Sequence, residues 1–334
     1  MSRIESLWKK LDEDNSFESG VVLKRYSSKS IQDYYAALIM PEKIKSIAIR
    51  IPSDIRVVSE LVNDLRDIKI KSYPDNLHED SKLLVISLVD DSLTEIFAVL
   101  CEDLFQKIRL IAVHKQLYDT LFERIQHWKE LFQKSKNSSL TTEKQKGLYG
   151  ELYFLNKIIE HTKNPIFCLD IWKGPEFGIR DFEYNKCAVE VKTSSTHNQQ
   201  KLFINSARQL DTSTLDSIFV MHLSVEIQNR VKHTLSEIVK KIKSGINTNY
   251  QAVTLFKMKL LKAGYIESHT SIYDKTGYEI RFEKYYHVKD DFPRIEENEI
   301  RTGVGDVKYS IIPPSNDNYL VSFNEVIKSL GAPA

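Results

Sequence analysis

Cysteine, long apolar runs and an excess of one charge are all scarce in this sequence of 334 residues. Its three cysteines, Cys101, Cys168 and Cys187, are odd in number and form no CxxC pair, so neither a disulfide framework nor a cysteine zinc site is expected. A reducing cytosol suits such a chain. Because the formal net charge is only +1, any surface for nucleic acid must be local.

The sequence also lacks segments that would direct the chain to a membrane. Residues 1–5 contain no apolar h-region of a secretory signal. The longest apolar runs, such as 83–89, have the length of a strand and are too short to span a bilayer. No Walker lysine motif is present, so the chain is not expected to be the ATPase of a complex. We therefore expect a cytoplasmic protein with no membrane partner.

The first part of the chain has the pattern of a mixed α/β unit. Strands are predicted at 36–40, 46–51, 68–71 and 83–89, with helices near 92–111 and 115–134. The polar stretch 133–139 lacks periodicity and is interpreted as a linker. We therefore place an N-terminal α/β domain at 1–138, a core domain at 139–245 and a mixed C-terminal region at 246–334.

Helix and strand patterns alternate in the rest of the chain. A long helix is predicted at about 142–160, where Thr142 and Gln145 have the spacing of a capping box. Strands are predicted at 167–172, 180–184, 187–193, 218–225, 278–288 and 307–312, and helices near 232–244, near 248–263 and from Phe323. The fold class indicated by this mixture is α/β.

The residues with the clearest chemical meaning lie in the segment 180–192, which is typical of a β-hairpin turning on 185–186. In that register Asp181 stands opposite Glu190, with Cβ atoms roughly 4.5–5.5 Å apart. Lys192 lies two residues beyond Glu190 and points to the same face. The other face receives apolar and aromatic side chains.

Two directly opposed carboxylates repel each other, and a divalent cation removes that repulsion. Mg²⁺ prefers hard oxygen ligands and commonly takes one or two carboxylates with substrate phosphate. A lysine beside the metal orients the attacking water or helps to deprotonate it, so the set supports hydrolysis of a phosphodiester. The alternative interpretation is a solvated hairpin face with a cross-strand salt bridge.

The long helix before the hairpin contains a carboxylate on a largely apolar stripe. Glu151 shares this stripe with Phe154 and Ile158, and burial there is costly unless the carboxylate has a partner. Gly147 and Gly150 each weaken a helix by roughly 1 kcal/mol relative to alanine. They suit a helix that another backbone approaches closely, as it would when packed across the hairpin. Glu151 would then reach the same metal site.

An acidic residue on a helix, followed by D…ExK on two adjacent strands, resembles the PD-(D/E)XK superfamily of restriction-endonuclease-like proteins. Four segments resemble one bacterial family within it, namely 147–152 (GLYGEL), 180–183 (RDFE), 189–193 (VEVKT) and 208–211 (RQLD). That family is often encoded beside helicase-like and methyltransferase genes of defence systems. The closest match covers about 145–225, and the layout is compatible with nearly the full length. Arg180 stands where the superfamily name has proline, at a position that varies.

The resemblance implies a role for each site residue. Asp181 and Glu190 would bind the metal, and Lys192 would serve the attacking water. Glu151 would support metal or water, and Gln209 would be an auxiliary active-site or DNA-contact residue. The backbone carbonyl of residue 191 (Val191) would complete the coordination sphere. The expected cofactor is Mg²⁺, for which Mn²⁺ can substitute.

The function implied by the resemblance is that of a Mg²⁺-dependent DNA nuclease with a restriction-endonuclease-like core, a mixed sheet flanked by helices. A type II-like restriction or phage-defence role follows from the same resemblance. Expected partners are DNA and a helicase-like ATPase or methyltransferase of the same system. A homodimer is expected if one site per chain cuts both strands. The alternatives are a nuclease fold that grips DNA without cutting it, and an adaptor subunit of a defence complex.

Overall fold

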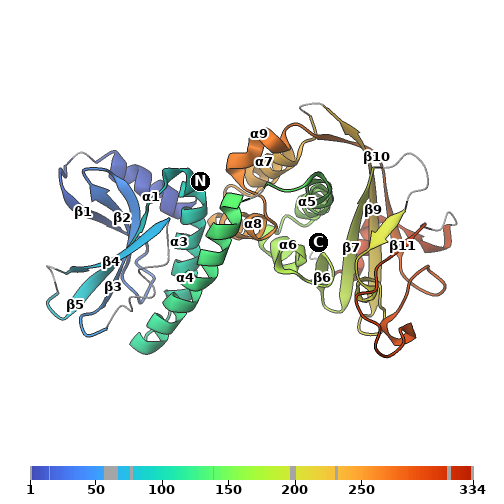
Figure 1. Ribbon diagram of the computed structural model, residues 1–334, viewed down its shortest axis with the longest axis horizontal. Coiled ribbons are helices and arrows are strands. Elements are labelled where there is room, and N and C mark those ends of the chain that lie inside the picture. The colour runs from blue at the N-terminus through green and yellow to red at the C-terminus, as the bar shows by residue number, and fades with distance from the viewer. Residues whose placement is uncertain are drawn as a thin grey trace. The chain divides into compact units, whose positions relative to one another are not determined.

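The computed structural model describes residues 2–14, 16–55, 67–75, 78–137, 139–195, 201–229, 232–313 and 317–331, without the side chains of 129–137. The chain divides into two compact units, Met1–Ser138 and Ser139–Ala334 (Figure 1). Helix α4 continues to Asn137, so residues 133–137 are helical where the sequence analysis predicted a linker. In the described part of the chain, no helix combines the length and apolar character needed to cross a bilayer.

The first unit consists of an antiparallel sheet with helices packed on it. Its helices are α1 (Arg3–Asp12), α3 (Thr94–Ile108) and α4 (His114–Asn137). Its strands, in sheet order, are β1 (Gly20–Arg25), β2 (Tyr34–Met40), β3 (Ile44–Pro52), β5 (Ser81–Leu88) and β4 (Ile68–Pro74). The strands and helices predicted for this region are confirmed. Helix α1 and strand β1 were not predicted.

Helix α1 has local signals that the sequence analysis did not use. The side chain of Ser2 caps the helix, and Glu5 completes a capping box. Ile4, Trp8 and Leu11 form the buried stripe. A short helix with these two features is stable once its stripe packs against the sheet.

Helix α3 places two carboxylates in the core of the first unit. Glu102 accepts a hydrogen bond of 2.7 Å from a backbone amide of α1 and another from the Tyr26 hydroxyl. Asp103 accepts from Arg124 Nε at 2.8 Å and from Trp128 Nε1 at 2.9 Å. Each buried acid therefore has donors from neighbouring segments, which is what makes its burial tolerable.

The second unit is built on a mixed sheet. Its strands, in sheet order, are β12 (Leu320–Val321), β10 (Gly277–His287), β9 (Ser217–Gln228), β7 (Cys187–Ser194) and β6 (Phe182–Tyr184). Strands β7 and β9 are parallel, and the other neighbours are antiparallel. A separate pair, β8 (Leu202–Ile204) and β11 (Tyr309–Ile311), lies beside it. Residues 246–334 thus supply β10 and β12 to the same sheet as β7.

Helices of the second unit are α5 (Thr142–Thr162), α6 (Pro165–Ile171), α7 (Leu235–Gly245), α8 (Tyr250–Lys262), α9 (Thr270–Tyr273) and α10 (Phe323–Ser329). The strand predicted at 167–172 was wrong, because α6 occupies this segment. Asn164 caps α6 and Pro165 stands in its first turn, and both are start signals of a helix. The cap of α5 is Thr141 rather than Thr142.

The two faces of the mixed sheet are covered by different elements. Phe219, Met221 and Leu223 of β9 belong to the core that includes α5. Ile218 and Val220 point the other way and pack with β8 and β11. Figure 1 shows α5 on one side of β7 and β9, with β11 on the other. The sheet therefore lies between a helical layer and the β8–β11 pair, the α/β arrangement that the sequence predicted.

Candidate active site

Strands β6 and β7 form the predicted hairpin in the predicted register. Phe182 pairs with Val189, and the turn falls at Asn185 and Lys186. Both turn residues have positive φ, 46° and 60°, as a two-residue turn of type I′ requires. The turn therefore fixes which side chains of the two strands stand opposite each other.

Asp181 lies immediately before β6, opposite the middle of β7. Its Oδ2 accepts a hydrogen bond of 2.7 Å from the Val191 amide. Its backbone carbonyl accepts from the amides of Lys173 at 2.7 Å and Gly174 at 3.0 Å. These bonds attach the loop after α6 to the hairpin and hold the Asp181 carboxylate at one place.

Helix α5 crosses β7 at Gly150. A Cβ at this position would overlap Thr193 Oγ1 and lie 3.3 Å from Val191 Cγ1, so no larger residue fits without a shift. The predicted close approach is therefore found at Gly150. Gly147 has open space around it, so the same reason does not apply there. The next side chain, Glu151, accepts a hydrogen bond of 2.7 Å from Trp172 Nε1 through its Oε2.

Gly174 is the point at which Glu151 and Asp181 meet. A Cβ built on Gly174 would overlap Glu151 Oε2 and lie 3.2 Å from Asp181 Oδ1. Gly174 is the first residue of a short 3₁₀ turn, Gly174–Glu176. The missing side chain lets two carboxylates from different elements converge at Gly174, and we call this point the Gly174 cradle.

Glu190, Lys192 and Gln209 form a second cluster that adjoins the first. Lys192 Nζ lies 2.8 Å from Glu190 Oε1 and donates to Gln209 Oε1 at 3.1 Å. Gln209 Nε2 donates to Glu190 Oε1 at 2.6 Å. The amide oxygen of Gln209 also accepts from the Asn205 backbone at 2.9 Å. One amide side chain therefore bridges the acid and the lysine and fixes the orientation of both.

Arg180 holds the segment that presents Gln209. Its guanidinium is buried and donates to the backbone carbonyls of Gln209 at 3.0 Å and Asp211 at 2.7 Å. The Glu183 carboxylate lies 3.9 Å from this guanidinium. Arg180 thus positions a turn from elsewhere in the chain against the hairpin, while the next residue supplies the Asp181 carboxylate.

Comparison with known families gives one match, which covers residues 4–312 of the 334. The matching family is described as "Putative PD-(D/E)XK family member, (DUF4420)". This chain belongs to that family.

The resemblance found in the hairpin and helix motifs is therefore confirmed, and the mixed sheet with its flanking helices is consistent with a restriction-endonuclease-like fold. No curated protein and no solved structure gives a match. Members of the PD-(D/E)XK superfamily are generally nucleases that use divalent metals.

The carboxyl groups of these two clusters all have raised pKa values, chiefly because of burial. Burial raises the pKa of Glu151 to about 7, against the Trp172 hydrogen bond. Burial, then the negative charges of Glu190 and Glu151, raise the pKa of Asp181 well above its usual range. Burial also raises the pKa of Glu190, although Lys192 opposes this. A cation bound among these groups would favour their ionised forms and lower their pKa values.

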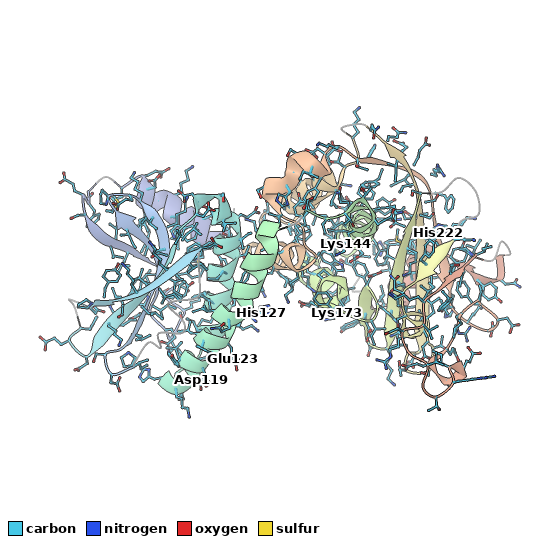
Figure 2. All side chains as sticks on the ribbon, in the orientation of Figure 1. Asp119, Glu123, His127, Lys144, Lys173 and His222 are labelled. Carbon is cyan, nitrogen blue, oxygen red and sulfur yellow. The ribbon has the colours of Figure 1, made fainter. Side chains whose placement is uncertain are left out.

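His222 stands beside Lys192 on the neighbouring strand β9 (Figure 2). Its Nε2 lies 2.8 Å from Ser194 Oγ, and burial lowers its pKa to about 4. The imidazole is therefore neutral near pH 7. Of these two neighbouring side chains, Lys192 is therefore the one that can present a positive charge to an anionic substrate.

The oxygens of the two clusters fit a divalent metal in part. Glu190 Oε2 is buried and accepts no hydrogen bond from the described residues, so one acid oxygen lacks a partner. The Gly174 cradle lies between two further carboxylates. Among the residues that the structure describes, no three Asp, Glu, His or Cys side chains have the arrangement of a complete metal site. Mg²⁺ commonly binds through only one or two carboxylates, with water and substrate phosphate, and this mode fits Glu151 and Asp181.

The predicted site residues Glu151, Asp181, Glu190, Lys192 and Gln209 all lie in the second unit, in the two adjoining clusters described above. For Val191, the structure places the backbone amide, as donor to Asp181, at the site. Whether its carbonyl binds metal stays a prediction.

Sequence reasoning missed three residues that shape the site. Trp172 binds Glu151, Gly174 leaves the cradle, and Arg180 holds the turn of Gln209. Some signals were available. Gly174 precedes a proline, which is typical of a tight turn, and a buried tryptophan needs an acceptor for its indole N–H.

Proposed function

We propose that this protein is a divalent-metal-dependent DNA nuclease. The observation that supports this best is the Gly174 cradle, where the Glu151 and Asp181 carboxylates converge with no side chain between them. Acids that raise one another's pKa values and lie in one site are the arrangement expected at a functional centre rather than in a core. Membership of the PD-(D/E)XK family supports hydrolysis of a phosphodiester as the chemistry.

Asp181 and Glu151 are the residues that would hold the metal, and Glu190 offers its unpartnered Oε2. A divalent ion bound there would polarise the scissile phosphate and acidify the attacking water. Asp181 is held in place by the Val191 amide, and Glu151 by the Trp172 indole. Both ligands are thus oriented before an ion arrives, which lowers the cost of binding one.

Lys192 would orient the attacking water and place a positive charge beside the phosphate as negative charge develops. Its Nζ is held between Glu190 Oε1 and Gln209 Oε1, so the ammonium has a fixed direction. Gln209 acts through Lys192 and Glu190 because its amide bonds to both. A preorganised cation of this kind stabilises developing charge more strongly than one that must reorient.

Cleavage of supercoiled plasmid and of a labelled single strand, in Mg²⁺, Mn²⁺ or EDTA, tests the proposal. The parent is expected to cut in metal only, and Lys192→Ala is expected to cut at least about 100-fold more slowly. Lys144→Ala is a matched control, because Lys144 is an exposed lysine in the first turn of α5 (Figure 2). Equal cutting by Lys192→Ala and the parent would contradict the assignment.

Two further aspects of the function rest on the family resemblance or on the chemistry of double-strand cleavage, and not on the geometry of the site. One is a restriction or phage-defence role with a helicase-like ATPase or methyltransferase as partner, and co-purification from the native host tests it. The other is a homodimer that cuts both strands, and sedimentation on a DNA duplex tests it. DNA binding without metal and without cutting would instead favour a nuclease fold that only binds DNA.

A further inference from the structure

The loop that leads to Asp181 displays an aromatic side chain to solvent. Phe177 is 90% exposed, the largest fraction among the exposed large apolar side chains of the described residues. Ile179, two residues on, is 48% exposed. Single exposed apolar residues are common on protein surfaces, so exposure alone indicates nothing. The construction of the loop and its place beside the carboxylates distinguish this case.

Phe177 is held in an unfavourable backbone conformation by a closed turn. Its φ is 58°, in the left-handed region that a bulky L-residue adopts at a cost in free energy. Its amide donates to the Gly174 carbonyl at 3.1 Å, and the Gly178 amide donates to the Lys173 carbonyl at 3.1 Å. A Cβ at Gly178 would clash with Lys173, so this glycine is needed where it stands. The turn therefore keeps a phenylalanine at a position where glycine would be easier.

The base of the same turn is fixed to the site and to helix α8. Asp181 accepts two backbone hydrogen bonds from it, as described above. Glu176, next to Phe177, lies 3.5 Å from the ammonium groups of both Lys259 and Lys262 on α8. The Lys259 ammonium also donates to the Trp172 carbonyl. The aromatic ring is thus mounted on a rigid support.

Phe177 is also close to the point where substrate phosphate would enter. Its amide bonds directly to Gly174, and Gly174 forms the cradle between Glu151 and Asp181. A phosphate bound at the metal site proposed there would bring the bases of its own strand to the rim of the turn. Lys173, labelled in Figure 2, and Lys262 add positive charge around this rim, with Glu176 as the neighbouring acid. The electrostatics therefore suit a nucleic-acid backbone.

We infer that Phe177 stacks on a base of the DNA strand whose phosphate binds at the metal site proposed for Glu151 and Asp181, with Ile179 widening the apolar contact. The inference rests on the proposed nuclease function and names how the substrate is held. Stacking suits a site that must tolerate many sequences, because every base has a π-face. An exposed aromatic on a rigid turn loses little conformational freedom when a base covers it.

The test compares binding of a DNA strand with and without bases. The protein used is the full chain with Lys192→Ala, so that Mg²⁺ can be present without cleavage. A labelled single strand and an abasic strand of equal length are titrated, and anisotropy gives each Kd. Phe177→Ala is expected to raise the Kd for the base-containing strand roughly 10-fold and to leave the Kd for the abasic strand unchanged. The slope of log Kd against log salt stays constant, because Phe177 neutralises no phosphate.

Two further variants serve as controls. Phe177→Trp keeps an aromatic face and is expected to bind like the parent. Tyr250→Ala removes another exposed aromatic, 54% exposed, at the far end of α8 and about 13 Å along the helix axis from Lys259. It is expected to change neither Kd. Because the Phe177 ring is almost fully exposed, Phe177→Ala should unfold at the same temperature as the parent.

Three results would overturn the inference while leaving the proposed function intact. Phe177→Ala could bind the base-containing strand as tightly as the parent. It could lose the same factor on the abasic strand, which would mean that the ring contacts something other than bases. It could also convert a parent dimer to a monomer, which would assign the ring to a second copy of the chain. A parent that binds neither strand would contradict the proposed function itself.

Discussion

Both units of this protein enclose carboxylates, and the surroundings of these groups differ. In the first unit, Glu102 and Asp103 each receive hydrogen bonds from donors on neighbouring segments. In the second, Glu151, Asp181 and Glu190 lie close enough for their charges to interact, and one oxygen of Glu190 has no partner among the described residues. The first pair contributes to the fold. The second set leaves one buried carboxylate oxygen without a partner among the described residues, which supports the proposed metal site.

The difference shows that burial alone does not mark a functional acid. A buried carboxylate with enough donors contributes to the fold. Its removal leaves those donors buried with one hydrogen bond fewer. Buried carboxylates that face one another disfavour the folded state whenever they ionise, unless a cation joins them. The identity of the neighbours, rather than the depth of burial, separates the two roles.

The largest expected effect concerns the structural carboxylates of the first unit. Asp103→Ala removes the carboxylate that accepts hydrogen bonds from Arg124 and from the Trp128 indole, and it should lower the free energy of unfolding by about 3 kcal/mol. Asp181→Asn removes a charge that repels its neighbours, so it should leave the stability of the metal-free protein unchanged or higher. Urea unfolding in EDTA measures both.

The two units can be followed separately in that experiment. Trp8 and Trp128 lie in the first unit and Trp172 in the second, so Trp→Phe variants assign each fluorescence transition. Equal destabilisation by Asp103→Ala and Asp181→Asn would show that the two regions do not differ as described.

A pH dependence of about 1–2 kcal/mol is expected from the second unit. The folded pKa of Glu151, about 7, lies above its unfolded value of 4.5, so its contribution to stability is fully present below pH 4.5 and is lost as pH rises through 7. Glu151→Gln cannot ionise and should be more stable than the parent at pH 8.5 but equal at pH 4. Metal-free urea midpoints at the two pH values measure this. A stability difference that is constant with pH would contradict the assignment.

A variant of Arg180 tests whether the position of Gln209 affects cleavage independently of metal binding. Arg180→Lys keeps the charge but cannot reproduce both bonds to the Gln209 and Asp211 carbonyls. Cleavage should fall about 10-fold, while the stabilisation of the fold by added Mn²⁺ stays as in the parent. Loss of the Mn²⁺ effect would instead place Arg180 in the metal site.

The smallest expected effect concerns the exposed Phe177 side chain. Phe177→Gly relieves the positive φ and should raise the free energy of unfolding by about 1 kcal/mol. The same variant should bind DNA more weakly. A loss of stability would mean that the ring packs against protein in solution.

The parts predicted correctly from sequence are those that local rules determine. A two-residue turn at Asn185 and Lys186 fixes the hairpin register, and the strand alternation then puts Glu190 and Lys192 on one face. The strand predicted at 167–172 is wrong, because the Asn164 cap and Pro165 in the first turn start a helix there. Boundaries elsewhere shifted by a few residues, as expected where helix ends compete with turns.

The contacts that complete the site depend on segments far apart in the chain. Arg180 and Gln209 lie 29 residues apart, and Trp172 and Glu151 lie 21 apart. Neither contact follows from periodicity, because tertiary packing decides which distant segments meet. Gln209 was proposed only through the family resemblance. The proline after Gly174 indicated a turn, but not that Glu151 and Asp181 meet there.

The central claim is that the carboxylates of the second unit form a metal site, and calorimetric titration of Mn²⁺ at pH 6 tests it most directly. Comparing two buffers with different heats of ionisation counts the protons released. We predict saturable binding with proton release, because burial raises the pKa of Glu151 to about 7 and the group must lose its proton to bind metal. Binding should disappear in Asp181→Asn and persist in Lys144→Ala. Folded parent protein that binds no Mn²⁺, or equal binding by Asp181→Asn, would contradict the claim.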